Sequence, residues 1–142
     1  MDTVLIDTDV LLDFFFDREP YSEFAADILN LCEENKLKGF TTPVIICNTY
    51  YLLRKTAKHE IVIEKLKQLL AIIDVLKIDK KIVLDSLNSD FKDFEDALQN
   101  FSAIKNGKIS VILTRNIKDY KTSDLAVMTP ETYLKGASAN RR

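Results

Sequence analysis

Short apolar runs alternate with stretches of helical periodicity along this chain. The apolar runs, which we expect to form strands, lie at Thr3–Ile6, Phe40-Thr41, Ala71–Ile78, Ile109–Leu113 and Leu125–Met128. The run that begins at Ile109 alternates too little for a strand that is wet on one face, and is typical of a parallel sheet covered on both faces. Strands that alternate with helices in this way predict a three-layer α/β/α sandwich around a mainly parallel central sheet.

Apolar positions three and four residues apart predict helices between these strands. The expected helices cover Val10–Pro20, Tyr21–Asn35, Pro43–Lys58, Glu60–Leu70, Lys80–Asn88, Phe94–Ile104 and Pro130–Lys135. Thr42 and Pro43 are a typical helix beginning, with Thr as the cap and Pro at the first helical position. Because 142 residues are enough for one core, we expect a single domain over residues 1–136 and a loose tail over residues 137–142.

Four polar side chains lie at positions that this architecture brings to one edge of the sheet, the edge at which the strands end. Asp7 ends the first strand, Asp119 follows the strand that ends at Leu113, and both Asn48 and Asp96 lie near the beginnings of helices. Helices run antiparallel to the strands of such a sheet, so helix beginnings and strand ends share the edge at which ligands bind. We therefore expect Asp96 and Asp119 to meet, with Asp7 beside them.

Carboxylates gathered in this way need a compensating charge or raised pKa values. Two carboxylates about 4 Å apart repel each other by roughly 4 kcal/mol near a protein surface. The donors here are hard oxygens without thiolate pairs or imidazoles, which favours Mg²⁺ or Mn²⁺ over zinc. Such an ion, held by Asp7, Asp96 and Asp119, is suited to phosphodiester hydrolysis because it polarises a phosphoryl oxygen and activates a water.

Composition narrows the classes of protein to consider. The formal net charge of −2 argues against nucleic-acid binding by bulk electrostatics, so such a ligand would need a local basic patch or a bridging cation. Cys32 and Cys47 are far apart and there is a single His, which disfavours a disulfide framework and a structural zinc site. We expect a cytoplasmic protein without membrane association, because neither a signal peptide nor a spanning helix is predicted.

Three segments together resemble the PIN-domain family, which consists of compact metal-dependent ribonucleases and includes the VapC-like toxins. The resemblance lies in VLIDTDVLLD, in TPVIICNTYYLLRK, and in DFEDALQNFSAIKNG followed by VILTRNIKDY. It implies that Asp7, Asp96 and Asp119 bind the metal and that Thr114 and Asn116 are polar members of the same site. It also implies Mg²⁺- or Mn²⁺-dependent endoribonuclease activity, an RNA substrate and a cognate antitoxin protein as partner.

One position departs from the common pattern of the family and leaves two other hypotheses open. Many family members have Glu where this chain has Asn48; an amide oxygen can still orient a water, but it carries no charge and cannot act as a base. The alternative to a nuclease is therefore a catalytically weak or inactive module that binds metal or RNA. A third hypothesis is a phosphatase of the haloacid-dehalogenase type with Asp7 as nucleophile, although Leu11 breaks that signature.

For the remaining polar and aromatic residues, a purely structural role is the alternative to a functional one. We expect Asp93 to cap the helix that follows, Asp90 and Glu95 to be solvated, and Tyr50 and Tyr51 to pack between helices. Asp9 is either a further acid of the site or a capping residue. A solvated surface is the alternative for the candidate RNA contacts, which are Arg54, Lys55, Arg115 and Lys118. The triple Phe14–Phe16 suggests either a homodimer surface or a two-sided core contact.

Overall fold

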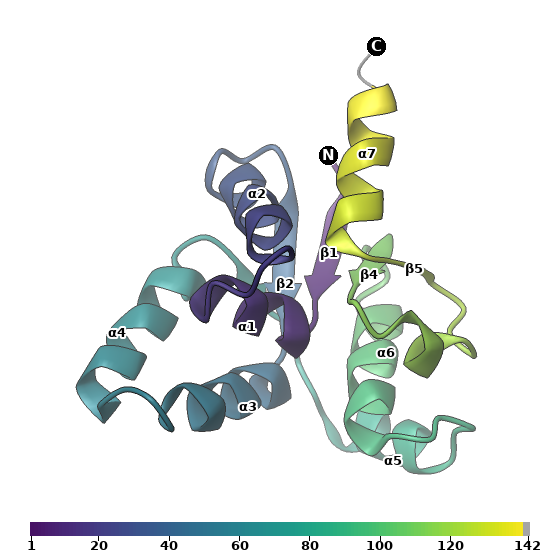
Figure 1. The fold of residues 1–142 in the computed structure, drawn as a ribbon. Helices are drawn as coiled ribbons and strands as arrows, with labels where there is room; N and C mark the ends of the chain where they lie inside the picture. The colour runs from purple at the N-terminus through teal and green to yellow at the C-terminus, as the bar shows by residue number, and fades with distance from the viewer. Residues whose placement is uncertain (141–142) are drawn as a thin grey trace.

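The computed structural model describes the backbone of residues 1–140 and the side chains of residues 1–137 (Figure 1). Its sheet has five strands in the order β3-β2-β1-β4-β5, and all four pairings between neighbours are parallel. The strands are β1 (Thr3–Ile6), β2 (Lys38–Thr41), β3 (Asp74–Val75), β4 (Val111–Leu113) and β5 (Ala126–Met128). The predicted parallel sheet is therefore confirmed.

Helices on either side of the strands complete an α/β sandwich. They are α1 (Thr8–Phe15), α2 (Ser22–Glu33), α3 (Pro43–Leu53), α4 (His59–Leu70), α5 (Lys80–Leu87), α6 (Phe94–Asn106) and α7 (Pro130–Asn140), with a short 3₁₀ helix, η1, at Ile117–Tyr120. The α5 and α6 helices pack on each other, whereas α1 packs on α2 and α3, and α3 on α4. Figure 1 shows α3 and α6 on opposite sides of the edge at which β1 ends.

Capping side chains fix where the helices of this edge begin. Asp7 caps α1 through Thr8, and the Thr42 hydroxyl accepts a hydrogen bond from the Ile45 N–H of α3 at 3.1 Å. Asp93 caps α6, as its position before the apolar pattern predicted, and Gly107 at φ 78° ends the same helix in the left-handed region. Each of these caps is encoded within a few residues of the element it begins or ends.

Four predicted elements had boundaries wrong by more than two residues. Helix α1 covers Thr8–Phe15 and not Val10–Pro20. Only Asp74–Val75 of the apolar run at 71–78 forms a strand, because Ala71 and Ile73 continue the hydrogen bonding of α4. Helix α3 ends at Leu53 and not at Lys58, since the next residues turn back onto Leu53. Helix α7 runs on to Asn140 instead of ending at Lys135, so part of the expected loose tail is helical; residues 141–142 lie outside the described residues.

The core lies around β1 and β4, whose apolar side chains are buried on both faces. Leu5, Ile6, Ile112 and Leu113 are 0% exposed, so the strand ends that position Asp7 are anchored in the most tightly packed part of the molecule. Phe15 and Phe16 pack against this core, which favours the core contact over a dimer surface for the Phe14–Phe16 triple. Across the part of the chain that the structure describes, every helix is too short or too polar to cross a membrane.

Candidate active site

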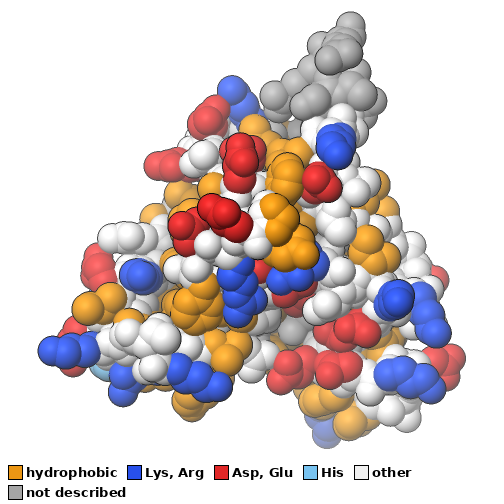
Figure 2. All heavy atoms as spheres, in the orientation of Figure 1, with side chains coloured by type: hydrophobic (Ala, Val, Ile, Leu, Met, Phe, Trp, Pro, Cys, Tyr) orange, Lys and Arg blue, Asp and Glu red, His pale blue; other side chains and the backbone are white. Residues whose placement is uncertain are grey.

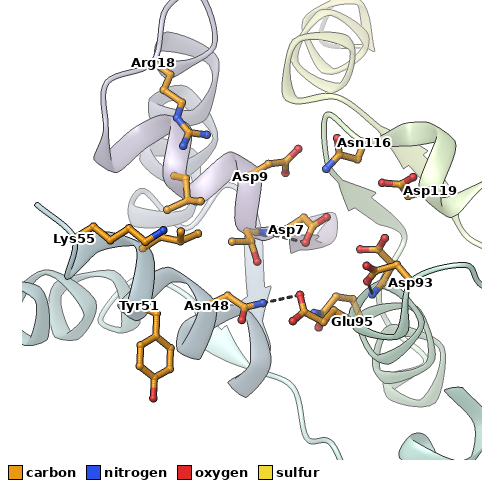
Figure 3. Close-up of a pocket in the computed structure, with 15 residues that line it drawn as sticks. Asp7, Asp9, Arg18, Asn48, Tyr51, Lys55, Asp93, Glu95, Asn116 and Asp119 are labelled. Carbon is orange, nitrogen blue, oxygen red and sulfur yellow. Dashed lines mark hydrogen bonds between the residues drawn. The ribbon is translucent and has the colours of Figure 1, made fainter. Parts of the chain in front are cut away.

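A cavity of about 550 Å³ opens between α3 and α6 at the carboxyl ends of the strands (Figure 3). Its lining brings together the acids that the sequence placed at this edge with several residues from α1 and α3 (Asp7, Asp9, Arg18, Asn48, Tyr51, Lys55, Asp93, Glu95, Asp96, Asn116 and Asp119). Figure 2 shows acidic side chains gathered on the α6 side of this region and basic ones on the side of α1 and α3. Acidic and basic side chains therefore gather on different sides of the cavity.

Asp7 is the most buried acid of the cavity, with 6% of its surface exposed. Its Oδ1 accepts the Thr8 N–H at 2.8 Å, and its Oδ2 accepts the hydroxyls of Thr114 at 3.0 Å and Tyr120 at 3.2 Å. Burial, and secondarily the negative charge of Asp9, raises the pKa of Asp7 to about 6 in spite of these hydrogen bonds. The β1–α1 junction thus holds one carboxylate in a fixed orientation and a poorly solvated place.

Asp96 faces Asp7 from the first turn of α6. Burial, followed in order of importance by the carboxylates of Asp7, Asp93 and Asp119, raises the pKa of Asp96 to about 7. Asp119 reaches the same cavity from η1 and is exposed. The predicted meeting of Asp96 and Asp119 is therefore confirmed as a shared cavity with electrostatic coupling between the two acids.

The loop after β4 connects the remaining polar residues of this edge. Thr114 is fully buried, and its Oγ1 accepts the Asn116 N–H at 3.0 Å while its hydroxyl donates to Asp7. The Arg115 N–H donates to Asp9 Oδ2 at 2.8 Å. Asp9 lines the cavity and does not cap α1, since Asp7 is the capping residue. The capping interpretation of Asp9 was therefore wrong.

Asn48 and Glu95 meet across the cavity. The Asn48 Nδ2 group on α3 donates a hydrogen bond to Glu95 Oε2 on α6 at 2.8 Å, as the dashed line in Figure 3 marks. We expected Glu95 to be a solvated residue of a helix start, and that prediction missed its place in the cavity lining. No local signal distinguishes it from Asp90, because the contact joins residues 47 positions apart.

Two basic side chains lie on the other side of the cavity, away from α6. Lys55 lines it from the turn after α3, as expected for a candidate phosphate contact, and Arg18 lines it from the turn after α1. Arg18 was not among the residues predicted from the sequence. Tyr51 is 64% exposed and also lines the cavity, so the expectation that it packs between helices was wrong.

Of the other candidate RNA contacts, Arg115 is engaged within the protein. Its Nε and Nη2 groups donate to the two oxygens of Asp13 at 2.6 and 2.9 Å, and its guanidinium lies 3.9 Å from the ring centroid of Tyr21. Arg54 donates to the Ala57 carbonyl at 3.0 Å, and Lys118 lines a neighbouring hollow with Asp93 and Asp119. Arg115 is thus a structural residue that ties the β4 loop to α1.

The oxygen donors of the cavity suit a hard divalent cation, although the side chains do not converge on a single position that would bind one. Within residues 1–137, no three His, Cys, Asp or Glu side chains are grouped closely enough to hold a metal ion. Mg²⁺ commonly takes only one or two protein carboxylates and keeps several waters, so such closure is not required. The raised pKa values of Asp7 and Asp96 are the electrostatic mark of acids that a cation would stabilise.

Comparisons with known proteins agree with this architecture. The chain is 27% identical to Ribonuclease VapC1 of Aquifex aeolicus (strain VF5) over 135 residues. This aligned region covers 92% of each protein. Its fold is similar to a toxin–antitoxin complex from Klebsiella pneumoniae, with a TM-score of 0.66, 21% identity, and 89% of this chain and 97% of that chain covered. FitAcB from Neisseria gonorrhoeae gives a TM-score of 0.67 at 15% identity, with 90% and 98% covered.

A family model described as PIN domain matches residues 3–118, which include Asp7, Asn48 and Asp96 and end one position before Asp119. The match argues against the phosphatase hypothesis, because it assigns the acid at the end of β1 to a different family. The matched residues include β1 to β4 and the helices that frame the cavity, whereas β5 lies beyond them. The chain belongs to the PIN-domain family.

Proposed function

We propose that this chain is a Mg²⁺- or Mn²⁺-dependent endoribonuclease that acts in the cytoplasm as the toxin of a toxin–antitoxin pair. The observation that carries the proposal is the shared cavity of Asp7, Asp96 and Asp119, in which two of the acids have raised pKa values. The name of the Aquifex aeolicus relative, a ribonuclease, and the toxin–antitoxin complex of similar fold support the substrate and the partner.

Asp7 and Asp96 would hold the ion, with Asp119 at the exposed side of the cavity. When bound, a divalent ion supplies polarisation of a phosphoryl oxygen and a lowered pKa of water. Thr114 and Tyr120 hold the Asp7 carboxylate in one orientation through their hydroxyls, so that it need not reorganise when a charge enters the cavity. Both acids act in their deprotonated forms, which ties the proposed activity to pH near neutrality.

The basic side of the cavity would position the RNA backbone. Lys55 and Arg18 lie on the side away from α6, where phosphates beyond the cleaved bond would be neutralised away from the acids of the cavity. Arg18 also lies 3.6 Å from Asp13 Oδ1, so Lys55 is the freer of the two. A chain with a net charge of −2 has no general attraction for RNA, so these two cations carry the electrostatic part of binding. Asn116, on the opposite side of the opening beside Asp119, would contribute a neutral amide.

The test is cleavage of a panel of structured RNAs by the purified protein with Mg²⁺, with Mn²⁺ and with excess chelator. We expect cleavage only with a divalent ion, and at least a hundredfold loss in Asp96→Asn, as is usual when a charged transition-state contact is removed. Asp27→Asn, an exposed acid on α2, is the matched control and should cleave like the wild type. Cleavage that persists in Asp96→Asn or in chelator would contradict the proposal.

Asn48 favours a second candidate, a PIN module that binds metal or RNA without turnover. Its amide leaves α3 without a carboxylate in the cavity. Metal binding without cleavage by the wild type, and cleavage gained in Asn48→Glu, would select this candidate. A cognate antitoxin and a homodimer are separate proposals; suppression of growth arrest by a co-expressed neighbouring small protein would support the first, and the mass measured in solution decides the second.

A further inference from the structure

The cavity receives carboxylates from β1, from α6 and from η1, but its α3 wall presents an amide. Asn48 occupies that wall, and its Nδ2 group is directed at Glu95 Oε2 on the opposite helix, 2.8 Å away. An amide nitrogen donates and does not accept, so it is a suitable neighbour for an ionised carboxylate. The side chain at position 48 thus holds a negative charge in place without carrying one.

Glu95 and Asp96 are consecutive residues in the first turn of α6, and consecutive helical residues point about 100° apart. Two such side chains do not ordinarily serve the same cavity. Here Asp96 is directed toward Asp7 and Asp119, while the longer side chain of Glu95 reaches toward α3, and both line the cavity. Figure 3 shows the Glu95 carboxylate on the same side of the cavity opening as Asn48.

We infer that Glu95 supplies the carboxylate that α3 lacks, and that Asn48 is the positioning residue that keeps it there. The inference rests on the proposed metal-dependent function. Glu95 adds a negative charge to the α3 side of the cavity, where it would support an ion held by Asp7 and Asp96 through the waters of that ion. The contact with Asn48 engages Oε2 and leaves Oε1 available to accept from a metal-bound water.

A simple tether between α3 and α6 is the competing explanation of the same hydrogen bond. The two explanations separate in Glu95→Gln, because glutamine keeps an oxygen that accepts from Asn48 and loses only the charge. A tether would survive this substitution unchanged. A metal-binding carboxylate would not.

The measurement is the dissociation constant of Mn²⁺ for the purified protein at pH 7.5, by the loss of free-ion signal in electron paramagnetic resonance. We expect Glu95→Gln to bind Mn²⁺ about tenfold more weakly, in the range found when a supporting group of a metal site is removed. Glu60→Gln, an exposed first-turn glutamate of α4, should bind like the wild type. The double variant Asn48→Glu with Glu95→Gln exchanges the acid and the amide, and should recover at least half of the lost affinity on a logarithmic scale.

Melting temperatures of the same variants check that each one folds. Affinity in Glu95→Gln within twofold of the wild type, or no recovery in the double variant, overturns the role of Glu95. Asp96→Asn separates this failure from that of the proposed function. If the wild type binds Mn²⁺ and Asp96→Asn does not, the metal site stands whatever Glu95 does; if the wild type binds no Mn²⁺, both proposals fall together.

Discussion

Removing the charge of Asp7 should stabilise the metal-free protein while it abolishes the proposed activity. The pKa of Asp7 is raised from 3.8 to about 6, so the folded state favours the protonated acid. The stability that depends on this proton is fully present below about pH 4 and is lost as pH rises through about 6. At pH 8 the metal-free wild type therefore carries an unfavourable buried charge.

The size of the effect follows from the same values. The difference between 3.8 and about 6 corresponds to about 3 kcal/mol, and Asp7 is only 6% exposed, so solvent screens little of it. Asparagine at this position keeps an oxygen for the Thr8 N–H but loses one acceptor for the hydroxyls of Thr114 and Tyr120, at a cost of about 1 kcal/mol. We expect Asp7→Asn to gain about 2 kcal/mol at pH 8 and nothing at pH 4.5.

Urea denaturation followed by circular dichroism, with chelator present, measures both conditions. The expected gain corresponds to an increase of about 6 °C in melting temperature at pH 8 for a domain of this size. Adding Mg²⁺ should stabilise the wild type and not the variant, because only the wild type keeps the charged acid that binds the ion. Equal effects of the substitution at both pH values, or a variant less stable than the wild type at pH 8, would refute the reasoning.

Three further substitutions test the fold around the site, each by urea denaturation. Arg115→Met removes the bidentate partner of Asp13, which is 1% exposed and keeps only Arg18, whose Nη1 lies 3.6 Å from Asp13 Oδ1. The substitution should cost about 2 kcal/mol, and a loss under about 1 kcal/mol would mean that the pair contributes little. Gly39→Ala should cost about 1–3 kcal/mol because the added Cβ would lie 2.8 Å from Cys32 Sγ, and unchanged stability would show that the strand can shift. Gly136→Ala, where nothing lies within 4 Å, should instead gain about 0.5–1 kcal/mol.

Local patterns predicted the parts of the site that depend on strand ends and helix caps. Asp7 follows an apolar strand whose last three residues are buried, and Asp93 precedes an apolar helical pattern, so both could be placed from their neighbours in sequence. The edge rule for parallel sheets then brought Asp96 and Asp119 together. These placements needed no knowledge of which helix packs against which.

The residues that were missed depend on contacts between distant segments. Glu95 has the same local signature as any acid in a first helical turn, and only the packing of α3 opposite α6 directs it toward Asn48. Arg115 stands among the site residues in sequence, but its guanidinium is bound by Asp13, 102 positions away. Hydrophobic periodicity carries no information about such pairs, because it describes the face of an element and not its neighbour.

The two kinds of site residue also differ in how tightly the fold holds them. The Asp7 N–H donates to the Leu113 carbonyl at 3.0 Å and the Thr114 N–H to the Met128 carbonyl at 3.0 Å, so backbone hydrogen bonds join the ends of three adjacent strands beneath the Asp7 carboxylate. Asn48 and Glu95, by contrast, meet through side chains of two helices, with half-buried Asn48 in the middle of α3 and exposed Glu95 in the first turn of α6. Because both residues lie on helices, exchanging the amide and the carboxylate between them changes no residue of the sheet. The inferred transfer of the acid from α3 to α6 would therefore leave the carboxylate at the end of β1 in place, and an amide at position 48 is compatible with the proposed metal site.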